Sequence, residues 1–303
     1  MRHLLLVGLV IAACRHPAEP VMVDAAGGDR LRVATFNVRR FFDTVCASGS
    51  CADGDYEALP SAAAFEARAD EIAAAIRLLE ADVVALQEIE TQAGLDALLA
   101  RLAPEMPHGV LGEIHTPASV DVAVVSRTPL DQVIGHRTSE PLTRPDGTVT
   151  TFSRELLEVH TRVDSGARVV LFAAHFKSKA GDDPGRRLAE AQVTSRIMTE
   201  VAAETPDALV VLGGDLNDTP GSPPLDALTA EGGLVRVADD LPEAAQATYL
   251  YLGRAQAIDH ILLAPTPVAA RVPRSSSVWW DGSGWGGSDH AALTSDFRVT
   301  SPR

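Results

Sequence analysis

From residue 31 onward, short apolar runs rich in β-branched residues alternate with longer amphipathic patterns, and this alternation constrains the fold more than any other feature. Short runs bounded by Gly, Pro and polar residues predict strands, while apolar positions three and four apart predict helices. Strands and helices mixed in this way are typical of an α/β protein in which two packed sheets are covered by helices. The predicted strands are 31–36, 83–87, 122–126, 156–161, 169–175, 209–213, 257–263 and 292–298, and the predicted helices are 62–79, 94–102 and 187–204.

The composition and charge limit the kind of protein that this chain can be. Of its 303 residues, 46% are hydrophobic and 22% are charged, as in ordinary globular proteins. The length would fit one large domain or two small ones, and a single domain over residues 31–298 is long for one core but allowed for layered α/β folds. The formal net charge of −15 argues against a protein that binds duplex nucleic acid over a broad basic surface. Any binding of nucleic acid must therefore depend on local Arg and Lys residues, or on a metal ion that offsets carboxylates.

The N-terminal residues have the pattern of an export signal. Arg2 and His3 precede an apolar run over 4–13, which is too short to span a bilayer because a crossing takes about 20 residues. The run ends at Cys14 in a segment that resembles the lipobox of bacterial lipoproteins, and Arg15 stands where an inner-membrane retention signal would have Asp. A plain secretory peptide is the alternative. We expect a signal peptide over 1–13, a lipidated Cys14 that begins a flexible tether over 14–30, a short tail over 299–303, and a cell-envelope lipoprotein at the outer membrane or periplasmic face, or a secreted protein.

Two cysteines remain once Cys14 is assigned to a lipid. In an exported chain, Cys46 and Cys51 are expected to form a disulfide, because oxidising compartments favour pairing. The short segment between them closes a small polar loop. Two free thiols are the alternative, and a zinc site is disfavoured because two cysteines lack the further ligands that structural zinc takes.

Polar side chains follow several of the predicted strands. Alone, Asn37 would be a turn residue, Glu88 a solvated strand end and His175 a structural histidine. Asp215 and Asn217 are two residues apart, so that in extended backbone their side chains would point the same way. Together, the oxygens of Asn, Asp and Glu are hard ligands that suit Mg²⁺ or Mn²⁺ and not zinc, while two histidines remain free for proton transfer. The set comprises Asn37, Glu88, His175, Asp215, Asn217, Asp259, Asp289 and His290.

In this order along the chain, the set resembles the endonuclease/exonuclease/phosphatase superfamily, which includes deoxyribonuclease I, exonuclease III-like repair enzymes, neutral sphingomyelinases and inositol polyphosphate phosphatases. The resemblance covers residues 31–298. It implies a four-layer α/β/β/α sandwich of two packed mixed sheets flanked by helices, and a metal-dependent phosphoric ester hydrolase. The implied cofactor is Mg²⁺, with Mn²⁺ or Ca²⁺ as alternatives. A catalytically inactive surface protein is disfavoured, because no member of the set is missing.

The resemblance also implies roles for individual residues. Glu88 would bind the metal, with Asn37 and Asp289 completing the site. His290 would act as the general base, oriented by the Asp259 carboxylate. The other catalytic residues would contact the water or the phosphate: Asp215 and Asn217 would position the attacking water and the scissile phosphate, and His175 would hydrogen-bond the phosphate and help the leaving group.

Three cations are expected to contact substrate phosphates. Arg154 and Lys177 lie in segments that resemble those of secreted nucleases, and Arg186 and Arg187 follow as part of the same basic patch. Arg39 stands where exonuclease III-like enzymes carry an acid, which favours the deoxyribonuclease I branch and argues against a second metal near the first strand. Solvated surface charges are the alternative for Arg39 and Arg154.

These residues predict a nuclease that acts on DNA or RNA, as a monomer with no protein partner. The alternative is a sphingomyelinase-like lipid phosphodiesterase, or an inositol-phosphate or other phosphomonoesterase of the same superfamily, since fold alone does not fix substrate. All three tryptophans lie in 279–285, just before Ser288. They could stack on bases, insert into a membrane interface or pack in the core.

Overall fold

The computed structural model describes residues 29–230 and 232–299. The predicted signal peptide over 1–13, the lipidated Cys14 and most of the expected tether and tail lie outside these residues. Asp29 and Arg30 pair with Val299 and Arg298 in the first sheet. Backbone pairing therefore continues one or two residues beyond the expected limits of the domain, 31–298.

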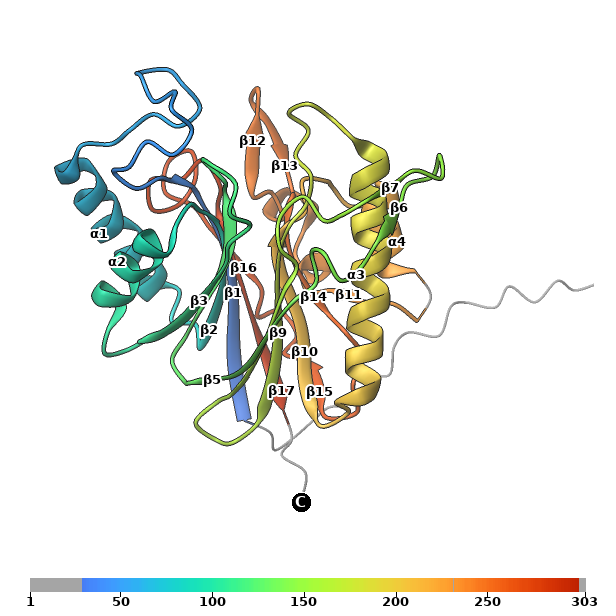
Figure 1. The fold of residues 1–303 in the computed structure, drawn as a ribbon. Helices are drawn as coiled ribbons and strands as arrows, with labels where there is room; N and C mark the ends of the chain where they lie inside the picture. Colours follow the sequence, from blue (N-terminus) through green and yellow to red (C-terminus); the bar gives the residue numbers. More distant parts are fainter. Residues whose placement is uncertain (1–28, 231, 300–303) are drawn as a thin grey trace, which may run out of the picture.

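The first sheet carries the N-terminal strand in its middle (Figure 1). In it, β1 (Asp29–Phe41) lies parallel to β2 (Val83–Ile89) and antiparallel to β17 (Ala292–Val299). The strand order is β15-β17-β1-β2-β4-β3, with β16 paired to β17. The outer strands are β15 (Ala269–Arg271), β16 (Ser277–Trp279), β4 (Asp121–Ser126) and β3 (His108–Gly112).

The second sheet is also mixed. There, β10 (Ala208–Asp215) lies parallel to β9 (Arg168–His175) and antiparallel to β14 (Asp259–Leu263). The order is β11-β14-β10-β9-β8-β5. Its outer strands are β11 (Val235–Arg236), β8 (Leu157–Arg162) and β5 (Leu130–Gly135), and two small hairpins stand apart, β6 (Leu142–Thr143) with β7 (Val149–Thr150) and β12 (Tyr249–Tyr251) with β13 (Arg254–Gln256).

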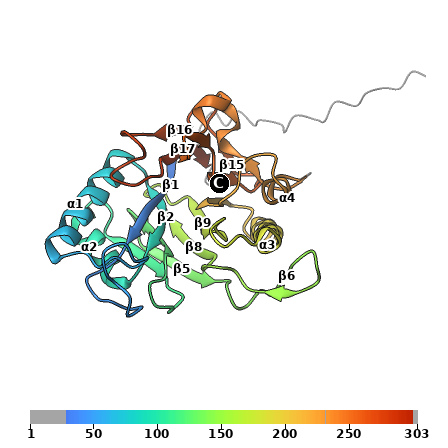
Figure 2. The same ribbon diagram turned by 90° about the horizontal axis from the view of Figure 1, so that it is seen from above.

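Helices cover the outer faces of both sheets (Figure 2). α1 (Ala62–Leu78) and α2 (Gln92–Leu102) pack on the first sheet, and α3 (Pro184–Glu204) and α4 (Pro223–Thr229) pack on the second. Two short 3-10 helices follow, η1 (Val237–Asp240) and η2 (Glu243–Ala245). The four-layer α/β/β/α sandwich that the family resemblance implies is therefore confirmed.

The central strands are apolar on both faces. In β1, Ala34 and Phe36 belong to the core under α1 and α2, whereas Leu31 and Val33 belong to the core between the sheets. Successive strand residues point to opposite faces, and here each face is covered by another layer. This double burial explains why the sequence shows continuous apolar runs rather than alternation.

The sheets approach each other closely at Gly213 in β10. A Cβ atom at this position would lie 3.0 Å from Ala85 Cβ and 3.1 Å from Thr35 Cβ, both of which belong to the other sheet. Contacts of this length are too tight for ordinary carbon atoms. The missing side chain therefore sets the spacing of the sheets two residues before Asp215.

The predicted strands and helices are all present, although their ends differ by up to a few residues. The sequence did not predict the short outer strands or α4, which begins with Pro223 and Pro224 and so has the composition of a loop. Trp279 and Trp285 pack against the core under α1, and Trp280 donates to the Ala247 carbonyl. Of the three interpretations of the tryptophans, the structure thus favours packing. Among the described residues, no helix is long and apolar enough to cross a membrane.

Candidate active site

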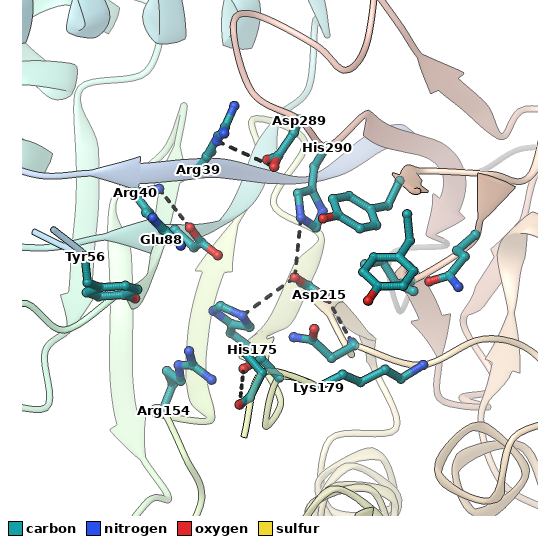
Figure 3. Close-up of a pocket in the computed structure, with 17 residues that line it drawn as sticks. Arg39, Arg40, Tyr56, Glu88, Arg154, His175, Lys179, Asp215, Asp289 and His290 are labelled. Carbon is teal, nitrogen blue, oxygen red and sulfur yellow. Dashed lines mark hydrogen bonds and ion pairs between the residues drawn. The ribbon is translucent and has the colours of Figure 1, made fainter. Parts of the chain in front are cut away.

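A cavity of about 520 Å³ opens where strands from both sheets end (Figure 3). β1, β2, β9 and β10 point their C-terminal ends toward this edge, and the antiparallel strands β14 and β17 begin there. Polar residues that are scattered along the chain therefore meet in one place. The predicted site residues that line the cavity are Arg39, Glu88, Arg154, His175, Asp215, Asn217, Asp289 and His290.

Two further predicted residues lie directly behind this lining. Asn37 is fully buried, and its Nδ2 donates to Glu88 Oε1 at 3.2 Å and to Asp215 Oδ2 at 3.0 Å. Asp259 is buried behind His290. The structure thus brings together every residue predicted for catalysis or metal binding. Asn37 and Asp259 do not line the cavity themselves but contact side chains that do.

His290 and Asp259 form a buried pair. His290 Nδ1 lies 2.9 Å from Asp259 Oδ2, and His290 Nε2 lies 3.9 Å from Asp215 Oδ2. Burial alone would lower the pKa of His290, but the carboxylates of Asp259, Asp215 and Glu88 outweigh it and raise the pKa to about 10. The Tyr249 ring packs on the imidazole with 4.7 Å between centroids. The ring of His290 is therefore fixed in orientation and strongly basic.

Asp215 stands at the centre of the polar cluster. Its Oδ2 lies 3.6 Å from His175 Nε2, and its Oδ1 accepts from the backbone N–H of Asn217 at 2.9 Å. Burial, and after it the nearby Asp259 carboxylate, raise the pKa of Asp215 to about 7. Burial and the positive charge of Arg154 hold the pKa of His175 well below its ordinary value, so that this ring is neutral.

Register shifts near the ends of β1 and β2, and a turn after β10, aim several of these side chains. Arg39, Arg40, Glu88 and Asn217 all have positive φ, between 43° and 70°. Non-glycine residues rarely adopt this conformation, and they tend to do so at functional sites. Asp215 and Asn217 do both line the cavity, but the expectation that extended backbone would align them is wrong, because Asn217 lies in a turn closed by the Asp215 carboxylate.

The donor set fits a divalent cation. Glu88 accepts from Asn37 Nδ2 and from the Arg40 backbone N–H, yet among the described residues no cationic side chain forms an ion pair with it. Asp259 Oδ1 is buried without a hydrogen-bond partner, and ligand atoms of Asp215, Asp259 and His290 lie within 4.8 Å of one another. The carboxylate of Glu88, which has no ion-pair partner in the described part of the chain, and the unpartnered Asp259 Oδ1 fit a cation, and oxygen donors suit Mg²⁺ or a similar hard ion.

Comparison with known proteins decides the family. A family model described as "Endonuclease/Exonuclease/phosphatase family" matches residues 34–290. The chain belongs to this family. It is therefore an enzyme of the metal-dependent phosphoric ester hydrolase class, as the sequence predicted. No curated protein matches the chain by sequence.

Solved structures of this family share the fold of the chain. An endonuclease/exonuclease/phosphatase from Bacteroides vulgatus has a TM-score of 0.64 at 18% identity, over 89% of this chain and 99% of that one. The human Nocturnin catalytic domain with bound sulfate anion has a TM-score of 0.63 at 17% identity, over 89% and 95%. TDP2 from D. rerio, complexed with single strand DNA product, has a TM-score of 0.59 at 17% identity, over 89% and 99%.

The lysine side chains near the cavity are arranged differently from the sequence prediction. Lys177 does not line the cavity, because its Nζ donates to the carbonyls of Ser178 and Ala180 at 3.0 and 2.8 Å. Lys179 lines it instead, 3.3 Å from Asp218 Oδ1. The expectation that the Lys177 side chain reaches substrate is therefore corrected in favour of Lys179.

Arg187 is also not a free surface cation. It is buried, its Nε donates to Asp218 Oδ2 at 2.8 Å, and its Nη1 donates to Asp182 and to the Lys177 carbonyl. Asp218 in turn pairs with Lys179. Arg187 thus ties the loop that carries Lys179 to the turn that carries Asn217.

Several lining residues have no counterpart in the predicted set. Tyr56 comes from the loop between β1 and α1, and Tyr249, Tyr251 and Gln256 come from the β12–β13 hairpin. The hairpin has a recognisable signal, alternating Tyr and Leu before Gly253. The position of Tyr56 has no such signal, because the loop around it lacks a regular pattern.

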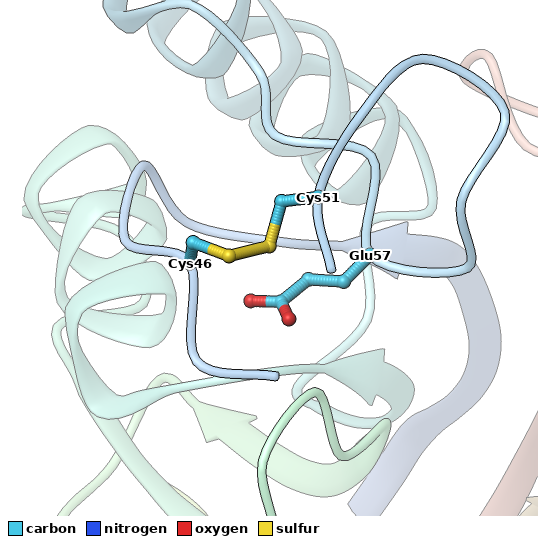
Figure 4. A group of neighbouring side chains, drawn as sticks. All are labelled: Cys46, Cys51 and Glu57. Atoms are coloured by element: carbon cyan, nitrogen blue, oxygen red, sulfur yellow. A yellow bond between two sulfur atoms is a disulfide. The ribbon is translucent and has the colours of Figure 1, made fainter. Parts of the chain in front are cut away.

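The loop between β1 and α1, which carries Tyr56, contains a disulfide (Figure 4). Cys46 and Cys51 form a disulfide with 5.9 Å between their Cα atoms. Glu57, which is buried, accepts hydrogen bonds from the backbone N–H groups of Ala47 and Ser48. The disulfide and Glu57 together give this irregular loop a defined shape next to the cavity.

Proposed function

We propose that this chain is an extracytoplasmic nuclease that hydrolyses the phosphodiester bonds of DNA, or of RNA, with Mg²⁺ as its metal ion. The observation that carries the proposal is the buried His290–Asp259 pair, which faces the same cavity as Glu88 and the cations Arg39 and Arg154. A fixed base, a carboxylate in need of a cation and guanidinium groups are what phosphodiester hydrolysis requires.

His290 acts as the general base in this proposal. Asp259 holds the ring through Nδ1, so that Nε2 faces Asp215 and the cavity, where it takes the proton of the attacking water. This role requires a neutral ring, while the surrounding carboxylates favour the charged one. When bound, a divalent cation supplies positive charge for the phosphoryl oxygens and opposes protonation of His290.

The remaining residues bind the metal or the phosphate. Glu88 holds the cation, with Asn37 and Asp289 completing the site. The neutral ring of His175 donates a hydrogen bond to the phosphate and supports the leaving group. Asp215 and Asn217 orient the water and the phosphate, and Arg39, Arg154 and Lys179 contact the neighbouring backbone.

The relatives and the N-terminal sequence support the two further parts of the proposal. The complex of D. rerio TDP2 with a single strand DNA product supports nucleic acid as the substrate. The lipobox-like segment that ends at Cys14 and the disulfide of Cys46 with Cys51 both suit an exported protein, anchored by a lipid at the cell envelope or secreted. We propose that it works there as a monomer.

A lipid phosphodiesterase is the second candidate. The observation in its favour is the tip of the β12–β13 hairpin, where Leu250 and Leu252 are exposed beside the cavity. An apolar tip next to an active site could reach into a lipid surface.

A substrate panel separates the two candidates. The purified protein is incubated with single- and double-stranded DNA, RNA, sphingomyelin vesicles and inositol phosphates, each with Mg²⁺ and with EDTA. We expect cleavage of nucleic acid that EDTA abolishes. Turnover of lipid or of inositol phosphates alone would overturn the nuclease proposal.

A further inference from the structure

We propose that the cavity selects nucleic-acid strands with unpaired bases, and that Tyr56 and Tyr251 are the two platforms on which those bases stack. The inference rests on the proposed nuclease function and names its substrate class. It follows from the exposure of the two rings, from the contacts that hold them and from the charges beside them.

Tyr56 is an exposed ring held in place from one side. Tyr56 is 50% exposed although it lines the cavity. The Arg40 guanidinium lies 4.6 Å from the ring centroid, and the Phe42 ring meets it edge-on at 5.7 Å. These neighbours fix the ring, and its exposed surface remains open to a planar ligand. Because the ring is already ordered, a ligand can stack on it at low entropic cost.

Tyr251 is placed with respect to the catalytic histidine. It lies in β12 two residues after Tyr249, which forms a β-bridge with His290 and packs on its ring. Residues two apart in a strand share a face, and both tyrosines line the cavity. Tyr251 is 54% exposed. The hairpin therefore offers a second open ring at a fixed offset from the proposed base.

The two segments that carry these rings are unusually apolar for a surface. Exposed large hydrophobic side chains are normally scattered singly. Among the described residues, more than half of them lie in the β1–α1 loop and the β12–β13 hairpin, which rise at the same end of the sandwich (Figure 1). These side chains are Val45, Tyr56, Leu59, Leu250, Tyr251 and Leu252.

The adjacent charges favour a nucleic-acid strand over a lipid tail. Arg40 and Arg154 line the cavity with Tyr56, and Figure 3 shows these three side chains near Glu88. Cations next to aromatic rings suit a strand in which phosphates alternate with bases. A hydrocarbon chain would offer these guanidinium groups no anionic partner.

A paired strand cannot use the two rings. In a duplex, each base is stacked between its neighbours, so only an unpaired base can lay its face on a tyrosine. The cavity of about 520 Å³ is in the range of sites for a small ligand. The net charge of −15 also withholds the broad attraction that duplex binders use.

The test compares one oligonucleotide in three forms: single-stranded, annealed to its complement, and single-stranded with abasic sites on both sides of the cleaved bond. With Mg²⁺ present, we expect the wild-type kcat/KM to be at least about 10-fold higher for the single strand than for the duplex. Tyr56→Ala and Tyr251→Ala should each raise KM for the single strand by roughly 5- to 150-fold, since one base–aromatic stack has about that effect.

Two comparisons make the stacking role specific. Tyr56→Phe and Tyr251→Phe keep the ring and should keep the single-strand preference. On the abasic strand, the rise in KM caused by each Ala variant should shrink to less than about 2-fold. Val149→Ala removes an equally exposed side chain that does not line the cavity, and should change nothing.

Failure of this inference differs from failure of the proposed function. Equal cleavage of single and double strands, together with unchanged kinetics in both Ala variants, would overturn the stacking platforms and leave the nuclease intact. Absence of cleavage of any nucleic acid, or turnover of phospholipid vesicles that depends on Leu252, would overturn both the stacking platforms and the nuclease proposal.

Discussion

His290 Nδ1 lies 2.9 Å from Asp259 Oδ2, and both side chains are buried at the edge of the cavity. A carboxylate in this position fixes the orientation and tautomer of an imidazole, which leaves Nε2 free to accept a proton. The pair joins the start of β14 in one sheet to the segment before β17 in the other. Proton transfer in the proposed reaction therefore depends on the packing of the two sheets.

Loss of either member of this pair should abolish most turnover. We expect His290→Ala and Asp259→Ala each to lower kcat on DNA by about 10²- to 10⁴-fold, because the water loses its base or the base loses its orientation. Melting temperatures report whether each variant is folded. His108→Ala, in β3 and outside the cavity, serves as the matched control. A folded His290→Ala variant with wild-type turnover would show that another group takes the proton.

The metal requirement should depend on Glu88. EDTA should abolish activity, and Mg²⁺ should restore it. Glu88→Gln removes the charge that attracts the cation, so the Mg²⁺ concentration for half-maximal activity should rise by at least about 10-fold. Glu105→Gln is the control: it removes an exposed carboxylate whose nearest cation, Arg77, lies 3.9 Å away, and should leave this Mg²⁺ concentration unchanged. An unaltered Mg²⁺ titration in Glu88→Gln would place the cation elsewhere.

Arg187 should stabilise both the fold and the substrate loop. Arg187→Ala leaves Asp218 buried without its main partner, which should lower the free energy of unfolding by about 3–5 kcal/mol. Arg187 also holds the loop that carries Lys179, so its loss should leave Lys179 less well placed for substrate, and KM for DNA should rise. Urea unfolding and steady-state kinetics measure the two effects. Arg196→Ala breaks exposed ion pairs and should cost less than about 1 kcal/mol. Equal stability losses in the two variants would contradict the role given to Arg187.

Glu158 should make the stability of the fold sensitive to acid. Burial alone would raise the pKa of this carboxylate, but hydrogen bonds from His136 and His160 outweigh it and lower the pKa from 4.5 to about 2. A group with a lowered pKa in the folded state stabilises fully above its unfolded pKa, and this stability is lost as pH falls from about 4.5 to about 2. Glu158→Gln should therefore melt at a lower temperature than wild type at pH 6, with a difference that shrinks toward pH 2. The exposed Glu204→Gln should show no such pH dependence.

Cys14 should determine where the protein is found in the cell. If Cys14 carries a lipid, the wild-type chain should fractionate with membranes and incorporate labelled fatty acid, while Cys14→Ser should lose both properties. Cys51→Ser, which breaks the disulfide and leaves the lipid site intact, is the control. Membrane association that persists in Cys14→Ser would point to another anchor.

The fold and the centre of the site could be predicted because they leave strong signals in the sequence. A strand covered on both faces reads as a continuous apolar run, as around Val33 and Val210, and a polar residue at its end, such as Glu88 or Asp215, then stands out. Strand ends at the same edge of a sandwich meet in space. Scattered motifs could therefore be assigned to one site before any contact was known.

The parts that could not be predicted depend on loops. Lys177 and Lys179 look equivalent in sequence, and only the path of the loop shows that backbone carbonyls engage the first while the cavity receives the second. Tyr56 reaches the cavity through an irregular segment whose shape depends on a disulfide and a buried Glu57. Asn217 adopts a left-handed turn that short-range propensity does not require.

Gly213 limits the spacing of the two sheets next to the candidate active site. Asn37 and Glu88 belong to one sheet and Asp215 to the other, so the distance between the proposed metal-binding and water-orienting groups depends on the spacing of the sheets. That distance is limited by the absence of a single methyl group opposite Ala85 and Thr35. A methyl group at this position would push the two sheets apart, and with them the two halves of the reactive centre, without contacting any of the proposed reacting residues.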